Sequence, residues 1–505
     1  MCQNHNVGAN LADVLSASAQ ESPASVALIE GDRRMTYAGL DDAVTALASG
    51  LVAKGLQRGD RVAIQQGNTM DFVVTLFGVL RAGGVAVPLN TSLADSEVRQ
   101  ATAAVSPRIL IVDPVNEAPD PELSCGVIVT GTPAWRELSD LSGAVDLPES
   151  QAEDVAVLLF TSGTEGVQRP AILTHRALLA NVEALLALDD PVAISATDRS
   201  LAVLPLFHIY SLNAVLALGL AAGATIVLCR RFDPGSTLEL IRAHDVTVVA
   251  GAPPMYVAWS AEPDLRDRLS HVRLLLSGAA PLAAALFDQF LTVTGHPIWE
   301  GYGLTECSPV VATTLVTGRP KAGCVGQALD NVSLKIVPEW AGGPGLTIDG
   351  LDDAEEAEPG EIWVRAPSLF SGYWPDGADG PDAEGWFGTG DVGYWDADGD
   401  LVLVDRRSDL VIVSGFNVYP REVERAIDAH PAVAECAVLG VPHPYSGEAV
   451  KAVVELNPGH SLTTEELVAY CEGRLARFKC PTIVSFVEAM PHDTTGKIAK
   501  EELRG

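Results

Sequence analysis

The chain has 505 residues, 48% of them hydrophobic, so it can bury large cores and is expected to fold as two or more domains. Its 33 basic and 66 acidic residues give a formal net charge of −33. Such a surface repels phosphodiester backbones and anionic lipid headgroups, which excludes nucleic acid as an expected partner. An anionic small molecule can bind only where local amides and cations overcome that field.

The predicted elements alternate along the chain. The pattern predicts helices over 40–54 and 71–82, each followed by a glycine, Gly55 or Gly83, of the kind that commonly ends a helix. Short runs of extended character precede and follow them: RVAIQQ, VAVPL, RILIVD, ATIVL, VTVVAG and HVRLLLSG. This alternation predicts α/β layers.

The segment 200–229, SLAVLPLFHIYSLNAVLALGLAAGATIVLC, is nearly free of charge and long enough to span a bilayer. Pro205, Gly219 and Gly223 interrupt it, and its last residues are β-branched like a short buried strand. We therefore expect a buried loop, helix and strand rather than a transmembrane segment.

The chain changes character after residue 340. Residues 341–360 are acidic and glycine-rich, which predicts an exposed loop. The runs EIWVRA, LVLVDR and DLVIVSG then predict a small twisted sheet, and the residues after 420 have their own alternation of helical and extended runs. We expect a domain boundary near 405–408.

Two features indicate the compartment. The 8 cysteines are scattered, without a CxxC pair or a zinc-like or disulfide-like spacing, as is typical of reduced thiols. The first residues, MCQNHNVGANLADVL, lack a basic flank followed by an apolar run, so no secretory signal is expected. We therefore predict a cytoplasmic protein.

Two motifs match sequence patterns of nucleotide-binding sites but lack the flanking residues or secondary structure that such sites require. GTGDVG at 388–393 fits GxGxxG, but two extended runs around a DADG turn follow it where a dinucleotide fold needs a helix. TTGKIA around Lys497 lacks the upstream glycine and the following Ser or Thr of a P-loop. Taken alone, His208 in LPLFHIY is more often a packed histidine than a catalytic one.

The stretch 160–175, FTSGTEGVQRPAILTH, has the hydroxyls and glycines of a loop that wraps an oligophosphate, although many surface turns share that composition. Six further motifs follow it in order: LPLFHIY, LLLSGAAPL, WEGYGLTECSP, GWFGTGDVG, VDRRSDLVIVSGFNVYPREVE and PHDTTGKIAK. With these motifs the chain resembles, over nearly its whole length, the adenylate-forming superfamily of acyl-CoA synthetases, nonribosomal peptide adenylation domains and luciferases. Within it, the chain is most similar to fatty-acyl-CoA ligases.

The resemblance implies an architecture. The fold class is α/β, with a large N-terminal domain (1–404) of layered α/β subdomains plus a small β-barrel-like sheet. The resemblance also implies a hinge at 405–408. After the hinge we expect a small, mobile α+β C-terminal domain (409–505) that carries the catalytic lysine.

The resemblance also implies a reaction. A carboxylic acid, a fatty acid by this likeness, and ATP give acyl-AMP and pyrophosphate, and the acyl group then passes to coenzyme A. Bringing two anions together requires cations and amides. Lys497 would contact the α-phosphate and His208 would lie between the ATP and acyl sites, with Thr305 as the third catalytic position. Glu306 and Thr164 would hold Mg²⁺, a hard ion that takes oxygen ligands.

The remaining matched positions are implied to bind the nucleotide or coenzyme A. Tyr302 would stack on adenine, and Asp391 with Arg406 would bind the ribose hydroxyls. The full set is Thr161, Ser162, Gly163, Thr164, Gly166 and Arg169 in the phosphate loop, then Gly278, Ala279, Ala280, Glu300, Gly301, Tyr302, Gly303, Asp391, Arg406, Ser414, Gly415 and Phe416.

The phosphate loop departs from the family pattern. Relatives usually have TSGTTGxPKG, whereas this chain has TSGTEGVQRP, with Glu165, Gln168, Arg169 and Pro170 at the altered positions. Arg169 keeps a cation, but Glu165 would repel a triphosphate. Its side chain could point to solvent or Arg169, help to ligate Mg²⁺, or weaken ATP binding. We hypothesise that Glu165 favours release of pyrophosphate.

Two other functions compete with the CoA ligase. An acyl-AMP ligase that loads a carrier protein would carry an extra segment between the GYW and TGD motifs, and here only PDGADGPDAEGWFGT separates Trp374 from Gly390. A degenerate paralogue that binds without catalysis is favoured by the altered loop and opposed by the intact Lys497, Glu306 and Asp391.

The expected acyl pocket lies near His208, 251–256, Ser277 and 301–305. Its small or apolar positions, Ala252, Pro253, Met255 and Ala280, fit an alkyl or aryl tail and disfavour a dicarboxylate such as malonate. The sequence leaves open the chain length of the acid and the assembly, a homodimer included.

Overall fold

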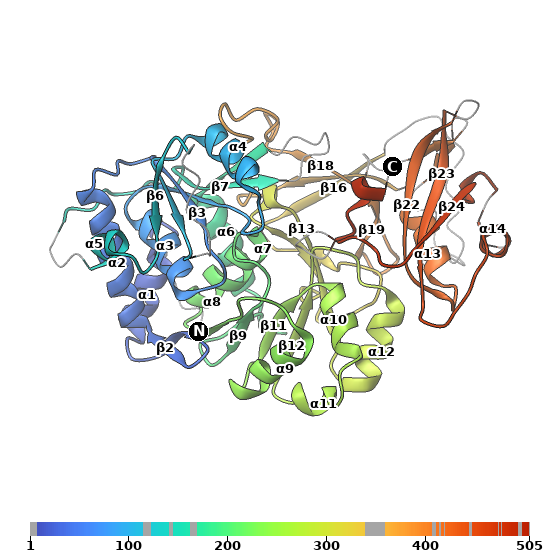
Figure 1. The fold of residues 1–505 in the computed structure, drawn as a ribbon, viewed down its shortest axis with the longest axis horizontal. Coiled ribbons are helices and arrows are strands. Elements are labelled where there is room, and N and C mark those ends of the chain that lie inside the picture. The colour runs from blue at the N-terminus through green and yellow to red at the C-terminus, as the bar shows by residue number, and fades with distance from the viewer. Residues whose placement is uncertain are drawn as a thin grey trace. The chain divides into compact units, whose positions relative to one another are not determined.

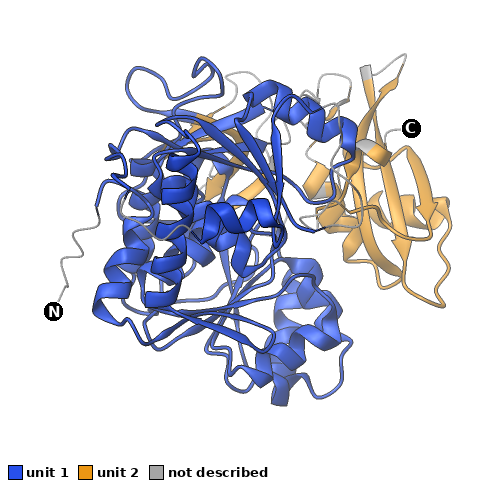
Figure 2. Cartoon of the chain, turned by 60° about the vertical axis from the view of Figure 1, so that its left-hand side comes forward, with its two compact units in different colours: residues 1–333, 365–387 blue, residues 334–364, 388–505 orange. Residues whose placement is uncertain are grey.

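The computed structural model describes residues 8–114, 123–140, 145–161, 169–338, 359–406, 411–413, 416–418, 420–443, 447–472, 474–475, 477–492 and 497–503. The chain forms two compact units, residues 1–333 with 365–387 and residues 334–364 with 388–505 (Figure 2). The predicted boundary at 405–408 lies only partly within the described residues and stays a prediction, and nearly all of the predicted acidic loop at 341–360 lies outside them.

Within the described part of the first unit, six strands form a sheet in the order β6-β5-β3-β4-β7-β8. Their bounds are β3 (Arg61–Gln65), β4 (Val85–Pro88), β5 (Ile109–Val112), β6 (Gly126–Val129), β7 (Val155–Thr161) and β8 (Arg169–Thr174). β3 pairs in parallel with β4 and β5, whereas β7 and β8 are antiparallel, with Thr161 opposite Arg169. The two residues that flank the 162–168 stretch are therefore neighbours across the sheet.

A second sheet of the first unit contains nine of the described strands, in the order β15-β14-β13-β12-β11-β9-β10-β1-β2. Their bounds are β1 (Val26–Glu30), β2 (Arg33–Thr36), β9 (Arg199–Ala202), β10 (Thr225–Leu228), β11 (Val248–Gly251), β12 (Leu274–Ser277), β13 (Ile298–Gly303), β14 (Val310–Thr313) and β15 (Gln327–Ala328). From β1 through β10, β9, β11 and β12 to β13 every pairing is parallel. The carboxyl ends of these strands therefore meet at one edge of the sheet, which is where open α/β sheets bind ligands.

Helices accompany both sheets (Figure 1). They are α1 (Asp13–Glu21), α2 (Tyr37–Ala53), α3 (Met70–Arg81), α4 (Asp95–Val105), α5 (Pro133–Ser139), α6 (His175–Leu186), α7 (Ile209–Ser211), the π-helix η1 (Leu212–Ala217), α8 (Leu218–Ala221), α9 (Pro234–Ala243), α10 (Pro253–Ser260), α11 (Leu265–Arg268), α12 (Ala284–Thr294) and the 3₁₀-helix η2 (Thr305–Cys307). The helices predicted over 40–54 and 71–82 are confirmed as α2 and α3. The glycines that follow them have positive φ, +86° at Gly55 and +71° at Gly83, as expected for helix ends.

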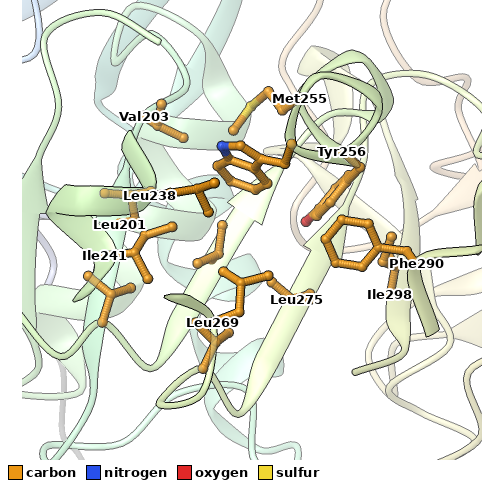
Figure 3. Packing of buried hydrophobic residues seen from close by; sticks show 14 of the residues in the cluster. Leu201, Val203, Leu238, Ile241, Met255, Tyr256, Leu269, Leu275, Phe290 and Ile298 are labelled. Carbon is orange, nitrogen blue, oxygen red and sulfur yellow. The ribbon is translucent and has the colours of Figure 1, made fainter. Parts of the chain in front are cut away.

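The core beside the candidate site is built around three aromatic rings. Tyr256 packs edge to face against Trp259 and Phe290, with ring centroids 5.6 Å and 5.3 Å apart. Such pairs contribute about 1 kcal/mol each beyond the area that they bury. Figure 3 shows Tyr256 and Phe290 in this cluster with Leu275 and Ile298 from β12 and β13. The cluster thus holds α10 and α12 against the strands whose ends carry the predicted motifs.

The segment 200–229 has the structure that the sequence predicts. It contains the end of β9, the helices α7, η1 and α8, and β10, and most of its residues are buried. Among the described residues, no helix is both long and apolar enough to cross a bilayer. The seven cysteines within these residues are free, in line with the prediction of reduced thiols.

The second unit contains two smaller sheets. Four described strands form the order β16-β17-β18-β19: β16 (Ser333–Pro338), β17 (Gly360–Arg365), β18 (Phe387–Trp395) and β19 (Leu401–Arg406). The GTGDVG motif lies inside β18, and β19 follows after a turn, so the rejection of a dinucleotide motif is confirmed.

The C-terminal part has its own sheet in the order β21-β20-β23-β22, with β24 beside β23. Its elements are β20 (Val411–Val413), β21 (Phe416–Val418), α13 (Pro420–Asp428), β22 (Val433–His443), β23 (Gly447–Leu456), α14 (Thr464–Glu472), the 3₁₀-helix η4 (Arg477–Lys479), β24 (Ile483–Val487) and the 3₁₀-helix η5 (Lys500–Leu503). The prediction that DLVIVSG joins EIWVRA and LVLVDR in one sheet is wrong, because β20 pairs with β21 and β23 instead. The mixed α/β architecture with a small α+β C-terminal part is confirmed.

Candidate active site

Four predicted motifs begin where neighbouring parallel strands end. The LPLFHIY segment follows β9, residues 251–256 follow β11, SGAAP follows β12, and GYGLTE lies at the end of β13. The register pairs Gly251 with Ser277 and Ser277 with Glu300. The structure therefore brings together, at one edge of the sheet, segments that the sequence separates widely.

Two glycines at this edge lie against tyrosine side chains. A Cβ atom at Gly278 would lie 3.1 Å from Cε1 of Tyr210, and one at Gly251 would lie 3.3 Å from the hydroxyl of Tyr256. That hydroxyl donates a hydrogen bond to the carbonyl of Leu276 at 2.6 Å, and burial raises the pKa of both tyrosines. Tyr210, which the sequence did not single out, is thus a further residue at the predicted acyl and adenine positions.

Several of the predicted nucleotide-binding positions are buried in β13 and beside it. Glu300 is 5% exposed, and its carboxylate accepts the amide of Leu282 at 3.3 Å. Tyr302 is 6% exposed, and a Cβ atom at Gly303 would lie 2.3 Å from the carbonyl oxygen of Pro309, so only glycine fits there. After β12, Ala279 has a φ of +69°, a conformation that costs on the order of 1 kcal/mol and recurs at functional sites.

The turn that carries Thr305 and Glu306 is fixed by buried asparagines. Asn213, in η1, donates hydrogen bonds to the carbonyls of Ser308 at 2.7 Å and of Leu178 at 3.0 Å. Asn181, in α6, donates to the carbonyl of Val310 at 2.7 Å. Both asparagines are 0% exposed, so the position of this turn is set by contacts within the core.

A network of polar contacts joins the predicted metal ligand to the predicted phosphate cation. Tyr373 donates a hydrogen bond to Oε1 of Glu306 at 2.5 Å. Burial and the nearby Glu306 carboxylate raise the pKa of Tyr373, so its hydroxyl stays a donor. The guanidinium of Arg169 lies over the Tyr373 ring, 4.5 Å from its centroid, and pairs with Asp379 at 2.5 Å. No sequence pattern points to Asp379, and Tyr373 entered the sequence analysis only as part of the GYW motif.

His208 and Thr161 lie at the borders of the site segments. His208 precedes α7, is half-buried, and its ring centroid lies 5.6 Å from that of Phe207. Thr161 ends β7 and donates a hydrogen bond from Oγ1 to the carbonyl of Arg169 at 3.2 Å. In the phosphate loop, the predicted positions Ser162, Gly163, Thr164 and Gly166 lie outside the described residues, as does Glu165.

In the second unit, Asp391 lies in β18 and is 9% exposed. The β18–β19 register places it opposite Arg406, and its amide donates to Oγ1 of Thr389 at 3.1 Å. Lys497 is exposed, and the residues directly before it, 493–496, are not among the described residues. Ser414 and Gly415 also lie outside it, and Phe416 is the first residue of β21.

The donor chemistry at Glu306 suits the metal that the family implies. A carboxylate that is 9% exposed, with one oxygen held by Tyr373, is a hard oxygen ligand of the kind that Mg²⁺ takes together with waters and phosphate oxygens.

Comparison with known proteins gives the same assignment over nearly the whole chain. The family model described as AMP-binding enzyme matches residues 15–374, and that described as AMP-binding enzyme C-terminal domain matches residues 422–497. A long-chain-fatty-acid–CoA ligase of Bacillus subtilis (strain 168) is 32% identical, over 98% of this chain and 94% of its own length. A feruloyl-CoA synthase of Amycolatopsis sp. is 36% identical, over 96% of each chain. The crystal structure of ATP-bound MatB from Rhodopseudomonas palustris has a TM-score of 0.89 and 32% identity, over 98% of each chain.

These likenesses extend over both family regions and agree with the order of the motifs and with the α/β architecture. The relatives share acyl-CoA formation by their names but differ in the acid that they activate. The chain therefore belongs to the AMP-binding enzyme family, as an acyl-CoA ligase of the adenylate-forming superfamily.

Proposed function

We propose that this chain is an ATP-dependent fatty-acyl-CoA ligase, which forms acyl-AMP and pyrophosphate and then transfers the acyl group to the thiol of coenzyme A. The observation that carries the proposal is the contact network of Glu306, Tyr373 and Arg169. It links a carboxylate suited to a metal with a cation suited to phosphate, as adenylation of a carboxylate by ATP requires.

The roles of the site residues follow the family positions. Tyr302 stacks on adenine, and Asp391 with Arg406 binds the ribose. Arg169 and the phosphate loop bind the phosphates, and Lys497 neutralises charge at the α-phosphate during the first half-reaction. Glu306 and Thr164 hold Mg²⁺, which when bound draws charge from the phosphate oxygens. His208 and Thr305 border the reacting carboxylate.

The acid is proposed to be a fatty acid because its expected surroundings are apolar. Ala252 is 2% exposed, Met255 6% and Tyr256 0%, and the stretches 251–256 and 277–282 contain no cationic residue. A buried surface without a cation favours a hydrocarbon tail over a second carboxylate.

An aryl acid is the second candidate. The ring of Tyr210 lies against Gly278, and an aromatic wall favours a planar substrate ring through offset or edge contacts. The 36% identity to a feruloyl-CoA synthase also supports this candidate.

The test is to incubate the purified protein with ATP, Mg²⁺ and a panel of fatty and aromatic acids, with and without coenzyme A, and to resolve acyl-AMP from acyl-CoA by mass spectrometry. Acyl-CoA from a fatty acid, formed only with the thiol, supports the proposal. Turnover of aryl acids alone selects the second candidate, and acyl-AMP that persists despite coenzyme A indicates a carrier-protein acceptor. If neither acyl-AMP nor acyl-CoA forms from any acid in the panel, the proposed function is overturned.

A further inference from the structure

The described residues of the segment 490–503, which are 490–492 and 497–503 and include Lys497, pack on the face of β22 and β23. Ile498, Leu503 and Met490 contact a cluster that includes Leu439 and Val453. His492 and Ile498 form an isolated antiparallel bridge, so the residues on either side of the Lys497 loop lie next to each other. Apolar packing of this kind holds the segment on the sheet but does not by itself fix its register.

A partly buried ion pair fixes the segment directly after Lys497. Lys500 Nζ lies 2.8 Å from Oε1 of Glu424, and these side chains are 24% and 16% exposed. The same carboxylate accepts the amide of Val438 at 2.7 Å. Glu424 therefore joins three elements, α13, β22 and η5.

Polar contacts also fix the rest of the segment. His492 Nε2 lies 3.1 Å from Oε1 of Glu435, and the amide of Met490 donates to Glu455 at 2.6 Å. Lys451 donates to the carbonyl of Leu503 at 2.8 Å. Of these contacts, the pair of Lys500 with Glu424 is the charged contact closest along the chain to Lys497, and it lies three residues away.

We propose that Glu424 is a positioning residue for Lys497, acting through Lys500. The pair aligns the loop so that the Lys497 ammonium reaches the α-phosphate during adenylation. This inference rests on the role proposed above for Lys497. Beyond that role, it assigns to the Glu424 carboxylate on α13 an effect on the rate of the first half-reaction and none on the rate of the second.

The separation between half-reactions follows from chemistry. Lys497 stabilises negative charge that develops while acyl-AMP forms, and attack of the coenzyme A thiol on acyl-AMP does not need that contact. A misplaced lysine therefore slows adenylation, whereas a merely structural role for Glu424 would slow both half-reactions or lower stability.

The variants are E424Q, K500M and the double variant. The amide oxygen of E424Q still accepts the Val438 N–H, so only the charge that faces Lys500 is lost. The matched controls are E137Q and K54M, which break an exposed pair of 2.9 Å in which the Lys54 and Glu137 side chains are 54% and 66% exposed. Acyl-AMP formation is measured in single turnover with dodecanoate, or with 4-coumarate if dodecanoate is not turned over. Thioester formation is measured separately from preformed acyl-AMP and coenzyme A.

We expect E424Q and K500M each to slow adenylation by on the order of 10-fold and thioester formation by less than about 2-fold. The double variant should be no slower than either single variant, because the two residues act as one unit. Equal losses in both half-reactions, or unchanged adenylation, overturn the proposal.

Hydrogen–deuterium exchange of the 490–503 peptide separates this inference from the proposed function. E424Q should raise its deuterium uptake, and E137Q should not. If wild-type protein forms no acyl-AMP with either acid, the proposed function fails, while the exchange result still decides whether Glu424 fixes the segment. Unchanged uptake in E424Q overturns the positioning role whatever the activity.

Discussion

The hydroxyl of Tyr373 donates a hydrogen bond to Oε1 of Glu306 at 2.5 Å, across a sequence separation of 67 positions. Because Glu306 is only 9% exposed, this bond helps to orient its carboxylate within a largely buried environment. The Tyr373 ring also supports the guanidinium of Arg169, so one side chain sets the positions of an anionic and a cationic group.

Replacing Tyr373 by Phe should impair the use of Mg²⁺. The change keeps the ring beneath Arg169 but removes a hydrogen bond to a charged group, worth about 2 kcal/mol. We expect the Mg²⁺ concentration for half-maximal acyl-AMP formation to rise by about 10-fold. The control is Y470F, which removes an exposed hydroxyl that donates to the carbonyl of Ala429 at 2.9 Å. An unchanged Mg²⁺ dependence would contradict the role of Glu306 as the metal ligand.

Replacing Asp379 by Asn should strengthen ATP binding. The Arg169 and Asp379 side chains are 39% and 70% exposed, so their pair contributes less than about 1 kcal/mol to stability. Without its partner carboxylate, Arg169 is available to phosphate, and we expect the KM for ATP to fall by about 3-fold. Asn is also tolerated at the positive φ of this position, +55°. E384Q, an exposed change in the same segment, should leave KM unchanged, and a higher KM in D379N would show that Asp379 instead holds Arg169 ready for ATP.

Replacing Glu165 by Thr restores the residue that relatives carry in the phosphate loop. Removing a carboxylate near a polyphosphate should tighten binding of both ATP and pyrophosphate by about 10-fold at low salt, with less effect at high salt. Isothermal titration with ATP and with pyrophosphate measures this directly. Equal affinities for E165T and wild type would refute the hypothesis that Glu165 promotes release of pyrophosphate.

Much of the fold follows from local patterns, whereas strand pairing does not. The helix over 40–54 is visible in its apolar spacing, but its true start at Tyr37 depends on Thr36, whose Oγ1 accepts the amide of Gly39 at 3.1 Å. The error in assigning DLVIVSG arose because its partner strand β23 lies more than thirty residues away, and nothing local distinguishes that edge from β19.

The same limit applies to the site. The motifs that contain Ser277 and Glu300 could be predicted because their residue types have local chemical meaning. Tyr210 and Asp379 could not, since their relevance comes only from tertiary contacts, with Gly278 and with Arg169. A lone tyrosine or aspartate belongs to no sequence pattern that predicts a partner 68 or 210 positions away.

Asp198 should be a large contributor to the stability of the first unit. It is 4% exposed and accepts two hydrogen bonds from Arg273, at 2.8 Å and 2.6 Å. Burial alone would raise its pKa, but hydrogen bonds from Arg273, Thr247 and Ser195 outweigh burial and lower the pKa to about 2. This stabilisation is therefore complete above the unfolded pKa of about 4 and is lost as the pH falls toward about 2.

We expect D198N to destabilise the protein by about 3 kcal/mol at pH 7, because it leaves Arg273 without its charged partner. Thermal melting monitored by circular dichroism checks the loss. The control is D245N, which removes an exposed partner of Arg199 at 3.3 Å and should cost less than about 1 kcal/mol. Similar losses of stability in D198N and D245N would show that the buried position of Asp198 makes its ion pair no more stabilising than an exposed one.

His175 should make the first unit sensitive to mild acid. Its ring is 1% exposed, and Nδ1 accepts the amide of Leu11 at 3.0 Å, so the neutral form anchors the N-terminal segment to α6. Burial lowers the pKa of His175 to about 4. Since the unfolded chain binds the proton with a pKa of about 6.5, stability is full above that value and falls as the pH drops toward about 4, by on the order of 3 kcal/mol. The variant H175N keeps an acceptor for Leu11 but cannot titrate. The difference in Tm between wild type and H175N should therefore stay constant above about pH 6.5 and shrink as the pH falls from there to about 4.5. H271N, at an exposed histidine, should follow the wild-type curve, and parallel curves for wild type and H175N would rule out His175 as the titrating group.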